Sequence, residues 1–146
     1  MQVNFFYKNL NSLPQSEIII KNICTHATDI LELPNTIDIC LYKLAKSTYG
    51  GIDRKKINRL VLNYDLPVKQ IPLILTHELI HINQRYTGVL EITKDGWHIW
   101  QKNFYLKADP ESLPYEQYSK LPWEVDVQCR LSTILKKILD KALTMW

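Results

Sequence analysis

Two histidines four residues apart, in a segment rich in apolar residues, constrain this chain more than any other feature. His77 and His81 are the ends of the sequence H-E-L-I-H. Pro72 suits the first turn of a helix, and Gly88 suits the position just after a helix end. Side chains at positions i and i+4 of a helix lie on the same face, one turn apart. We therefore predict a helix over residues 72–86 that turns both imidazoles toward one metal ion.

Glu78 follows the first histidine and is rotated by about 100° from it around the helix axis. From that position its carboxylate can flank a metal without binding it. It can then take a proton from an activated water molecule and return it to a leaving amine. We predict zinc as the metal and Glu78 as the catalytic general base. The alternative is a core helix that carries histidines and no metal.

A catalytic zinc site usually has three protein ligands and one open position, so a third ligand is required. Glu124, Asp126 and His98 are the candidates, and the sequence leaves all three open. Glu124 falls in the first turn of a helix predicted from Pro122 to the C-terminus, where a glutamate can also simply interact with the helix dipole. Asp126 lies about 200° further round that helix, so both acids cannot easily bind. Asp126 better suits a partner for an imidazole N–H.

The remaining pattern predicts a single α+β domain, residues 1–146, with helices on one side of a small sheet. The predicted elements are a helix from Pro14 to about Leu33, strands over 36–44 and 58–63, a turn or exposed strand over 49–52, and a hairpin of 89–93 and 97–105 around an Asp-Gly turn. With 46% hydrophobic residues, the chain can bury a core without staples.

Charge does not indicate a nucleic-acid partner. The net charge is only +3. The densest basic cluster lies within a helical apolar pattern and reads as a solvated helix face; it consists of Arg130, Lys136, Lys137 and Lys141. No apolar run approaches the ~18 residues of a membrane span, and no secretory signal pattern is present. We predict a protein without a membrane partner, with a cytoplasmic location.

Three cysteines, Cys24, Cys40 and Cys129, are widely spaced and include no C-x-x-C pair. An odd and sparse set of cysteines fits a reducing compartment better than a disulfide framework. We expect all three to be free thiols that pack in the core.

Two segments together resemble a known family. Residues 77–84 read H-E-L-I-H-I-N-Q and residues 122–126 read P-W-E-V-D. They look like the small gluzincin-type zinc metallopeptidase domains of bacteria and phages, the minigluzincins, and the resemblance covers about residues 36–130. It implies a zincin-like fold in the cytoplasm of a bacterial or phage-infected cell. It also implies a zinc ion held by His77, His81 and Glu124, with Glu78 as the base.

In such domains an edge strand beside the metal binds the substrate as an added strand, and residues 49–52 are our candidate. Tyr118 is our candidate for stabilising the oxyanion, with Tyr115 and His98 as rivals. The predicted function is hydrolysis of a peptide bond in a peptide or protein substrate. Two alternatives remain: a binding or inhibitory protein on the same scaffold with a structural or vestigial metal site, and zinc-dependent hydrolysis of another amide.

Overall fold

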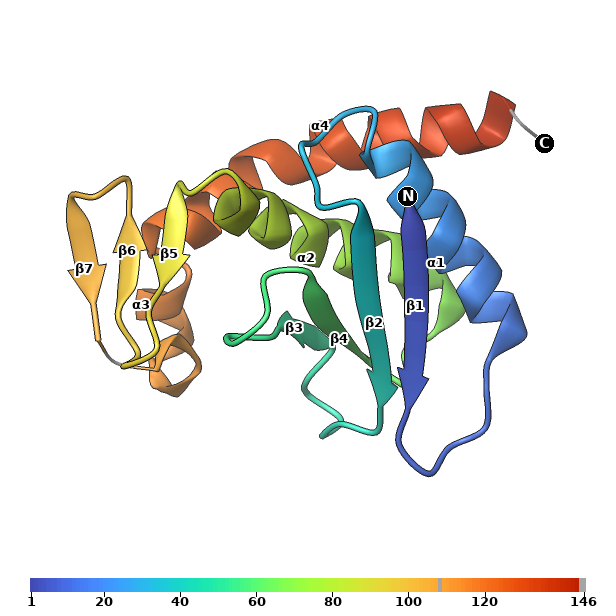
Figure 1. The fold of residues 1–146 in the computed structure, drawn as a ribbon, viewed down its shortest axis with the longest axis horizontal. Coiled ribbons are helices and arrows are strands. Elements are labelled where there is room, and N and C mark those ends of the chain that lie inside the picture. The colour runs from blue at the N-terminus through green and yellow to red at the C-terminus, as the bar shows by residue number, and fades with distance from the viewer. Residues whose placement is uncertain (108, 145–146) are drawn as a thin grey trace.

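The structure is a computed structural model that describes residues 1–107 and 109–144. Figure 1 shows two separate sheets joined by long helices. In chain order the elements are β1 (Gln2–Tyr7), α1 (Pro14–Ala27), β2 (Thr36–Tyr42), β3 (Gly50–Ile52), β4 (Arg59–Asn63), α2 (Ile71–Tyr86), β5 (Leu90–Ile92), β6 (His98–Trp100), β7 (Phe104–Leu106), α3 (Tyr115–Tyr118) and α4 (Pro122–Thr144), with short 3-10 turns at Val68–Gln70 and Pro110–Ser112. The predicted α+β class is confirmed.

The larger sheet has the strand order β1-β2-β4-β3. β1 pairs with β2 and β2 pairs with β4 in parallel, whereas β3 runs antiparallel to β4. Alternate residues of β2, namely Ile37, Ile39 and Leu41, are buried in the core that the helices cover. Within the part of the chain that the structure describes, β3 pairs only with β4, so it is an edge strand of this sheet, and it lies next to α2 (Figure 1).

The central helix α2 is held by its apolar face. Leu75, Leu79 and Ile82 recur at helical spacing and are fully buried in the main core. Removing one such side chain typically costs about 2–5 kcal/mol, so packing rather than helix propensity fixes α2 in place. The helix begins one residue before the predicted start, and Gly88, with φ +83°, follows its end.

The smaller sheet, order β5-β6-β7, is antiparallel and lies between α2 and α4 in the chain. It has its own small core, in which Leu90 packs with Leu121 and Trp123. Trp123 belongs to the first turn of α4, so this core anchors the start of α4 to the smaller sheet.

Several predicted boundaries were wrong. β1 was not predicted at all. The first helix ends at Ala27 rather than near Leu33, because the chain turns there and Leu31 reaches the core from that turn. The second arm of the predicted hairpin, residues 97–105, is divided into β6 and β7, since Gln101 and Lys102 adopt positive φ angles of 50° and 62° and reverse the chain.

The cysteine prediction holds in part. All three cysteines are free, and Cys24 and Cys40 are buried as expected. Cys129 is exposed on α4, so the core placement predicted for it was wrong. Three lysines of the basic cluster, Lys136, Lys137 and Lys141, lie on an exposed face of α4, as predicted. The predicted helix to the C-terminus is described as far as Thr144, and its last two residues lie outside the described part of the chain.

Candidate metal centre

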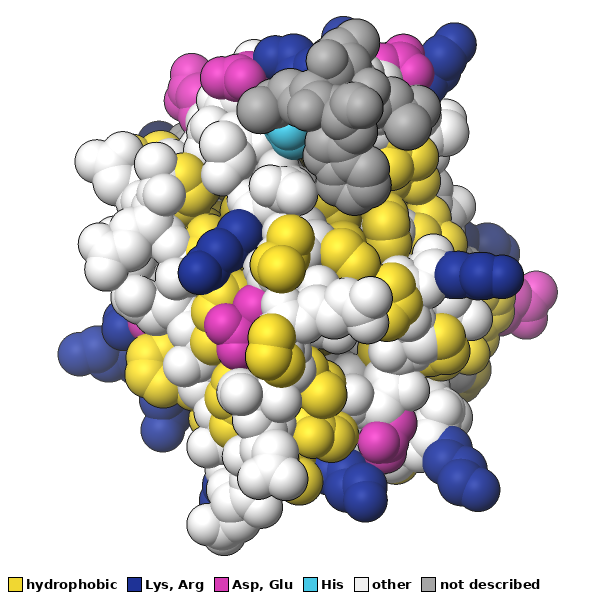
Figure 2. Space-filling model, turned by 90° about the vertical axis from the view of Figure 1, so that its right-hand side faces the viewer, with side chains coloured by type: hydrophobic (Ala, Val, Ile, Leu, Met, Phe, Trp, Pro, Cys, Tyr) yellow, Lys and Arg dark blue, Asp and Glu magenta, His cyan; other side chains and the backbone are white. Residues whose placement is uncertain are grey.

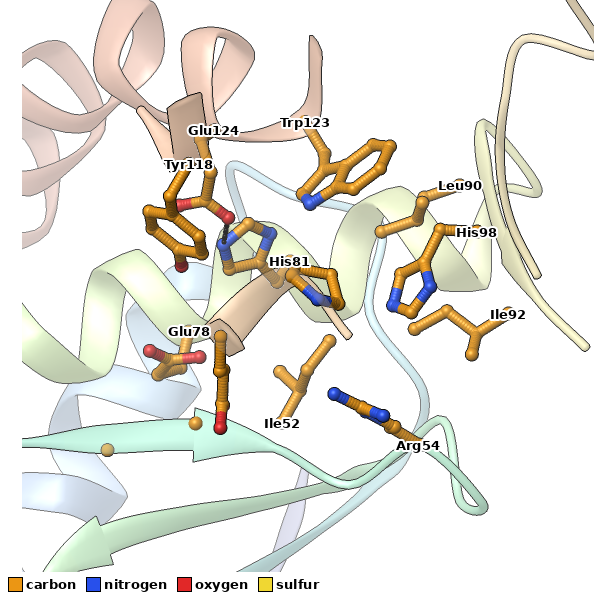
Figure 3. Close-up of a pocket in the computed structure, with 14 residues that line it drawn as sticks. Ile52, Arg54, Glu78, His81, Leu90, Ile92, His98, Tyr118, Trp123 and Glu124 are labelled. Carbon is orange, nitrogen blue, oxygen red and sulfur yellow. Dashed lines mark ion pairs between the residues drawn. The ribbon is translucent and has the colours of Figure 1, made fainter. Parts of the chain in front are cut away.

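Two helices bring together the three residues of the candidate metal centre. His77 and His81 lie one turn apart on α2, with ring centroids separated by 5.0 Å. Glu124 projects toward His81 from the first turn of α4 (Figure 3), and it faces His77 as well. Its Oε2 atom lies 2.9 Å from His81 Nε2, and its Oε1 atom lies 3.4 Å from His77 Nε2. One carboxylate therefore faces both imidazoles.

These distances fit an ion held among the three side chains. One ligand atom from each of the three lies within 4.8 Å of the other two. Two atoms that each bind a tetrahedral zinc at 2.0–2.1 Å would lie about 3.3 Å apart, close to the separations seen. Within the described residues this is the one group of histidine, cysteine and acidic side chains that could hold a metal ion.

Burial and charge keep the acid of this group in its ligating form. The side chains of Glu124 and His81 are each 5% exposed, and that of His77 is 29% exposed. Burial alone would raise the pKa of Glu124, but hydrogen bonds and the charges of the two imidazoles outweigh it and lower the pKa to about 2. Burial acts to lower the pKa of His81, but the hydrogen bond to Glu124 and the charge of Glu124 outweigh burial, so the pKa of His81 is raised.

Glu78 lies beside this group and is outside the set of three. Its side chain is buried and turns toward the cleft between α2 and β3 (Figure 3). Burial raises the pKa of its carboxyl, and the nearby charges of His81 and His77 act in the opposite direction. A carboxylate next to a metal group, facing a cleft, can exchange protons with a molecule bound there.

The cleft consists of two hollows that share Gly50, Glu78, Glu111 and Tyr118 as common walls. The smaller hollow, about 80 Å³, lies on the side of His81. Its lining combines apolar and ionisable side chains (Figure 3). The apolar ones include Ile52, Leu90, Ile92 and Trp123, and the ionisable ones include Arg54, His98, Glu78 and Glu124. The larger hollow, about 580 Å³, lies on the side of His77 and is bordered by Tyr49, Ile74, Leu113 and Tyr115.

Two glycines at the open edge of β3 bring the backbone close to the cleft. A Cβ atom on Gly50 would lie 2.7 Å from the carbonyl oxygen of Val61, closer than real Cβ contacts allow. A Cβ atom on Gly51 would lie 3.8 Å from Glu111 Oε1, which is an ordinary contact. Gly50 is therefore required for the pairing of β3 with β4.

Tyr118 lines both hollows next to Glu124. Burial is the largest cause of a strongly raised pKa for its hydroxyl; the charges of Glu124 and Glu78 and a hydrogen bond to Glu124 add to the effect. The hydroxyl therefore stays protonated and can donate. Tyr115, its rival, borders only the larger hollow and is 78% exposed.

The other histidines do not join the group. His98 stacks on Trp123, with centroids 5.5 Å apart, and burial lowers its pKa. It lines the smaller hollow and is outside the set of three. His26 is buried on α1, as expected of a packing residue. Asp126 is also outside the set. It was predicted to contact an imidazole, but it accepts a hydrogen bond from Gln84 and forms an ion pair with Arg130 instead.

Neither family models, nor curated proteins, nor solved structures gave a match to this chain. The resemblance to minigluzincins therefore rests on the motif residues, and the structure adds to it a His-His-Glu group that could hold a metal ion. Within the described residues, no helix has both the length and the apolar character that a membrane span requires.

Two residues of the site, Gln84 and Arg54, were not predicted from the sequence. Gln84 is a fully buried amide next to His81, and its position three residues later on the same helix face was a usable signal. Arg54 lines the smaller hollow and forms an ion pair with Asp109. Nothing in the local sequence signals that placement, because Arg54 and Asp109 meet only through the tertiary fold.

Proposed function

We propose that this protein is a zinc-dependent metallopeptidase. The observation that carries the proposal is the arrangement of His77, His81 and Glu124 around one point, with Glu78 beside them at the floor of a cleft. The cleft runs along the open edge of β3, which is where an extended polypeptide can add as a further strand.

Zinc is the proposed ion because two imidazoles and one carboxylate form a common ligand set of catalytic zinc sites, in which a fourth position stays open. Zinc bound there would polarise the scissile carbonyl and lower the pKa of the attacking water. The ionised state of Glu124 supports this assignment, since a carboxylate must be deprotonated to bind a metal.

The residues of the chain then have distinct roles. Glu78 takes the proton from the attacking water and delivers it to the leaving amine. Tyr118 donates its hydroxyl hydrogen to the oxygen that becomes negatively charged in the transition state. The backbone of Gly50 and Gly51 pairs with the substrate main chain, so recognition depends on an extended peptide conformation.

The test compares zinc content and peptide hydrolysis in the wild type, in Glu78→Gln and in Glu116→Gln. Glu116 is an exposed acid of α3 outside the site and serves as the matched control. We expect one zinc per chain in all three proteins and hydrolysis of a mixed peptide library only by the wild type and the control. Loss of general-base catalysis typically lowers the rate by about 10²–10⁴-fold.

Two outcomes contradict the proposal. One is a purified wild type that holds no stoichiometric zinc even when zinc is supplied. The other is hydrolysis by Glu78→Gln at the rate of the wild type.

A second candidate is a binding or inhibitory protein on the same scaffold, with a structural or vestigial metal site. It is favoured by exposed aromatic side chains, Tyr105 on β7 and Tyr115 at the border of the larger hollow. Under this alternative the biological effect of the protein is unchanged in Glu78→Gln and is lost when Tyr105 and Tyr115 are replaced by serine.

A further inference from the structure

We propose that Gln84 is a positioning residue of the metal centre. Its amide keeps Nδ1 of His81 protonated, so that Nε2 is the nitrogen left to bind the ion, and it ties α2 to the turn of α4 that carries Glu124. The inference rests on the proposed metal site but not on peptide hydrolysis. It concerns residues that do not belong to the ligand set themselves.

The hydrogen-bond partners of Gln84 fix the orientation of its amide. Its nitrogen lies 2.9 Å from the carbonyl oxygen of Trp123 and 2.9 Å from Oδ2 of Asp126. A carbonyl and a carboxylate only accept hydrogen bonds, so both amide hydrogens are used there. The remaining atom, Oε1, must therefore face His81.

This orientation determines which nitrogen of His81 carries the hydrogen. Oε1 of Gln84 lies 2.8 Å from His81 Nδ1. An amide oxygen cannot donate, so Nδ1 must be the donor. Nε2 is the atom that points to Glu124, and it is then available to a metal. A donor N–H held in this way orients the ring of a metal-binding histidine.

A charged pair holds Gln84 in turn. Arg130 Nη2 lies 3.1 Å from the same Oδ2 atom of Asp126, so the guanidinium and the Gln84 amide meet at one carboxylate oxygen. Arg130 also donates to the side chain of Asn83, and Asn83 donates to the backbone of Glu32. The network thus runs from the loop after α1, through α4, to the metal-binding face of α2.

The same network connects the two helices that supply the ligands. Gln84 belongs to α2, whereas both partners of its nitrogen, Trp123 and Asp126, flank Glu124 on α4. Gln84 is 1% exposed, so water cannot replace these bonds if the amide is removed. The distance between His81 and Glu124 therefore depends on the side chain of a third residue, Gln84.

The experiment measures zinc affinity by chelator competition in Gln84→Met, Gln84→Glu and Ile138→Ala. Gln84→Met keeps the length of the side chain and removes the amide. Gln84→Glu keeps an acceptor for His81 Nδ1 but loses both donors. Ile138 is fully buried on α4 away from the network, so its truncation is the control for a loosened α4.

We expect Gln84→Met to weaken zinc binding by about 10–100-fold, as is typical of residues that support metal ligands. Ile138→Ala should lower stability with little change in affinity. A second readout is the Nδ1–H signal of His81 in nuclear magnetic resonance spectra. It should exchange slowly in the wild type with or without zinc, persist in Gln84→Glu, and exchange rapidly in Gln84→Met.

Three results would overturn the proposal: a His81 that binds zinc through Nδ1, an Nδ1–H signal that is unaffected in Gln84→Met, or equal losses of affinity in Gln84→Met and Ile138→Ala. If Gln84→Met does not fold, Asp126→Asn should weaken zinc binding and speed the exchange of the His81 Nδ1–H, each to a smaller extent. The absence of both changes counts against the proposal. A wild type with no zinc affinity refutes the metal site, whereas a zinc-binding protein without hydrolysis leaves the role of Gln84 intact.

Discussion

The carboxylate of Glu124 lies 2.9 Å from Nε2 of His81, although one residue belongs to the first turn of α4 and the other to the middle of α2. The proposed ligand set is therefore complete only when α4 is docked on α2. Val127, fully buried just after Glu124, is part of the core that holds this docking in place.

The first prediction follows from this contact. Glu124→Ala removes one of three ligands, and we expect zinc affinity to fall by more than the roughly 10–100-fold typical of supporting residues. Chelator competition measures the change, and Asp140→Ala, at an exposed site on the same helix, is the control. Retention of zinc at wild-type affinity would mean that another residue is the third ligand.

The second prediction concerns the hydroxyl of Tyr118. Tyr118→Phe keeps the ring that lines both hollows and removes the donor. Loss of one oxyanion donor typically lowers kcat by about 10²–10³-fold, and we expect zinc content to be unchanged. Tyr115→Phe is the control and should retain the wild-type kcat. Equal activity of the two variants would remove Tyr118 from the mechanism.

The third prediction compares neighbouring glycines of β3. Gly50→Ala forces a methyl group against the carbonyl of Val61, so we expect the free energy of unfolding to fall by about 1–3 kcal/mol. Gly51→Ala meets only the end of the Glu111 side chain, at an ordinary distance, and should change stability by well under that amount. Urea unfolding of both variants checks the contrast, and equal effects would contradict it.

The fourth prediction concerns stability in acid. Burial acts to raise the pKa of Asp38, but hydrogen bonds from Lys56 and Asn4 and the charges of Lys56 and Arg59 outweigh it, so the pKa is lowered. A lowered folded-state pKa means that the unfolded chain binds the proton first as the pH falls. The stabilisation is thus complete above the unfolded pKa, about 3.9, and is lost as the pH falls through the folded value.

Asp38→Asn should therefore be less stable than the wild type at neutral pH, and the difference should shrink in acid. Thermal unfolding followed between neutral pH and about pH 3, below the unfolded pKa, measures it. Asp65→Asn, at an exposed site in the turn after β4, is a suitable comparison. A difference between Asp38→Asn and the wild type that is constant with pH would show that the charge of Asp38 does not stabilise the fold.

The helix of His77 and His81 was predictable because its signals are local: apolar periodicity, a proline at its start and a glycine after its end. β1 was not, because its pairing partner β2 lies more than thirty residues away and adjacent Phe5 and Phe6 obscure the alternation. The division of residues 97–105 was also hidden, since Gln101 and Lys102 are not the residues that usually mark a left-handed turn.

The residues of the site also differ in how far the local sequence predicts them. The spacing of two histidines determines that they share a helix face. No spacing determines which of Glu124, Asp126 and His98 meets them, because that depends on how α4 docks. Of the three, the structure brings Glu124 to both imidazoles, while Asp126 supports Gln84 and His98 stacks on Trp123.

The three-stranded sheet of β5, β6 and β7 is a separate excursion between the two helices that carry the metal ligands (Figure 1). Figure 2 views the molecule from the right-hand side of Figure 1, the end remote from this sheet, and shows hydrophobic side chains interspersed with charged ones. The turn of the small sheet at Asp95 and Gly96 lies outside the lining of both hollows, so we expect that it can change in length or sequence without moving His77, His81 or Glu124. Under the proposed function, remodelling this one module offers a route to new substrate preferences, and libraries confined to residues 93–97 are a practical starting point for redesign.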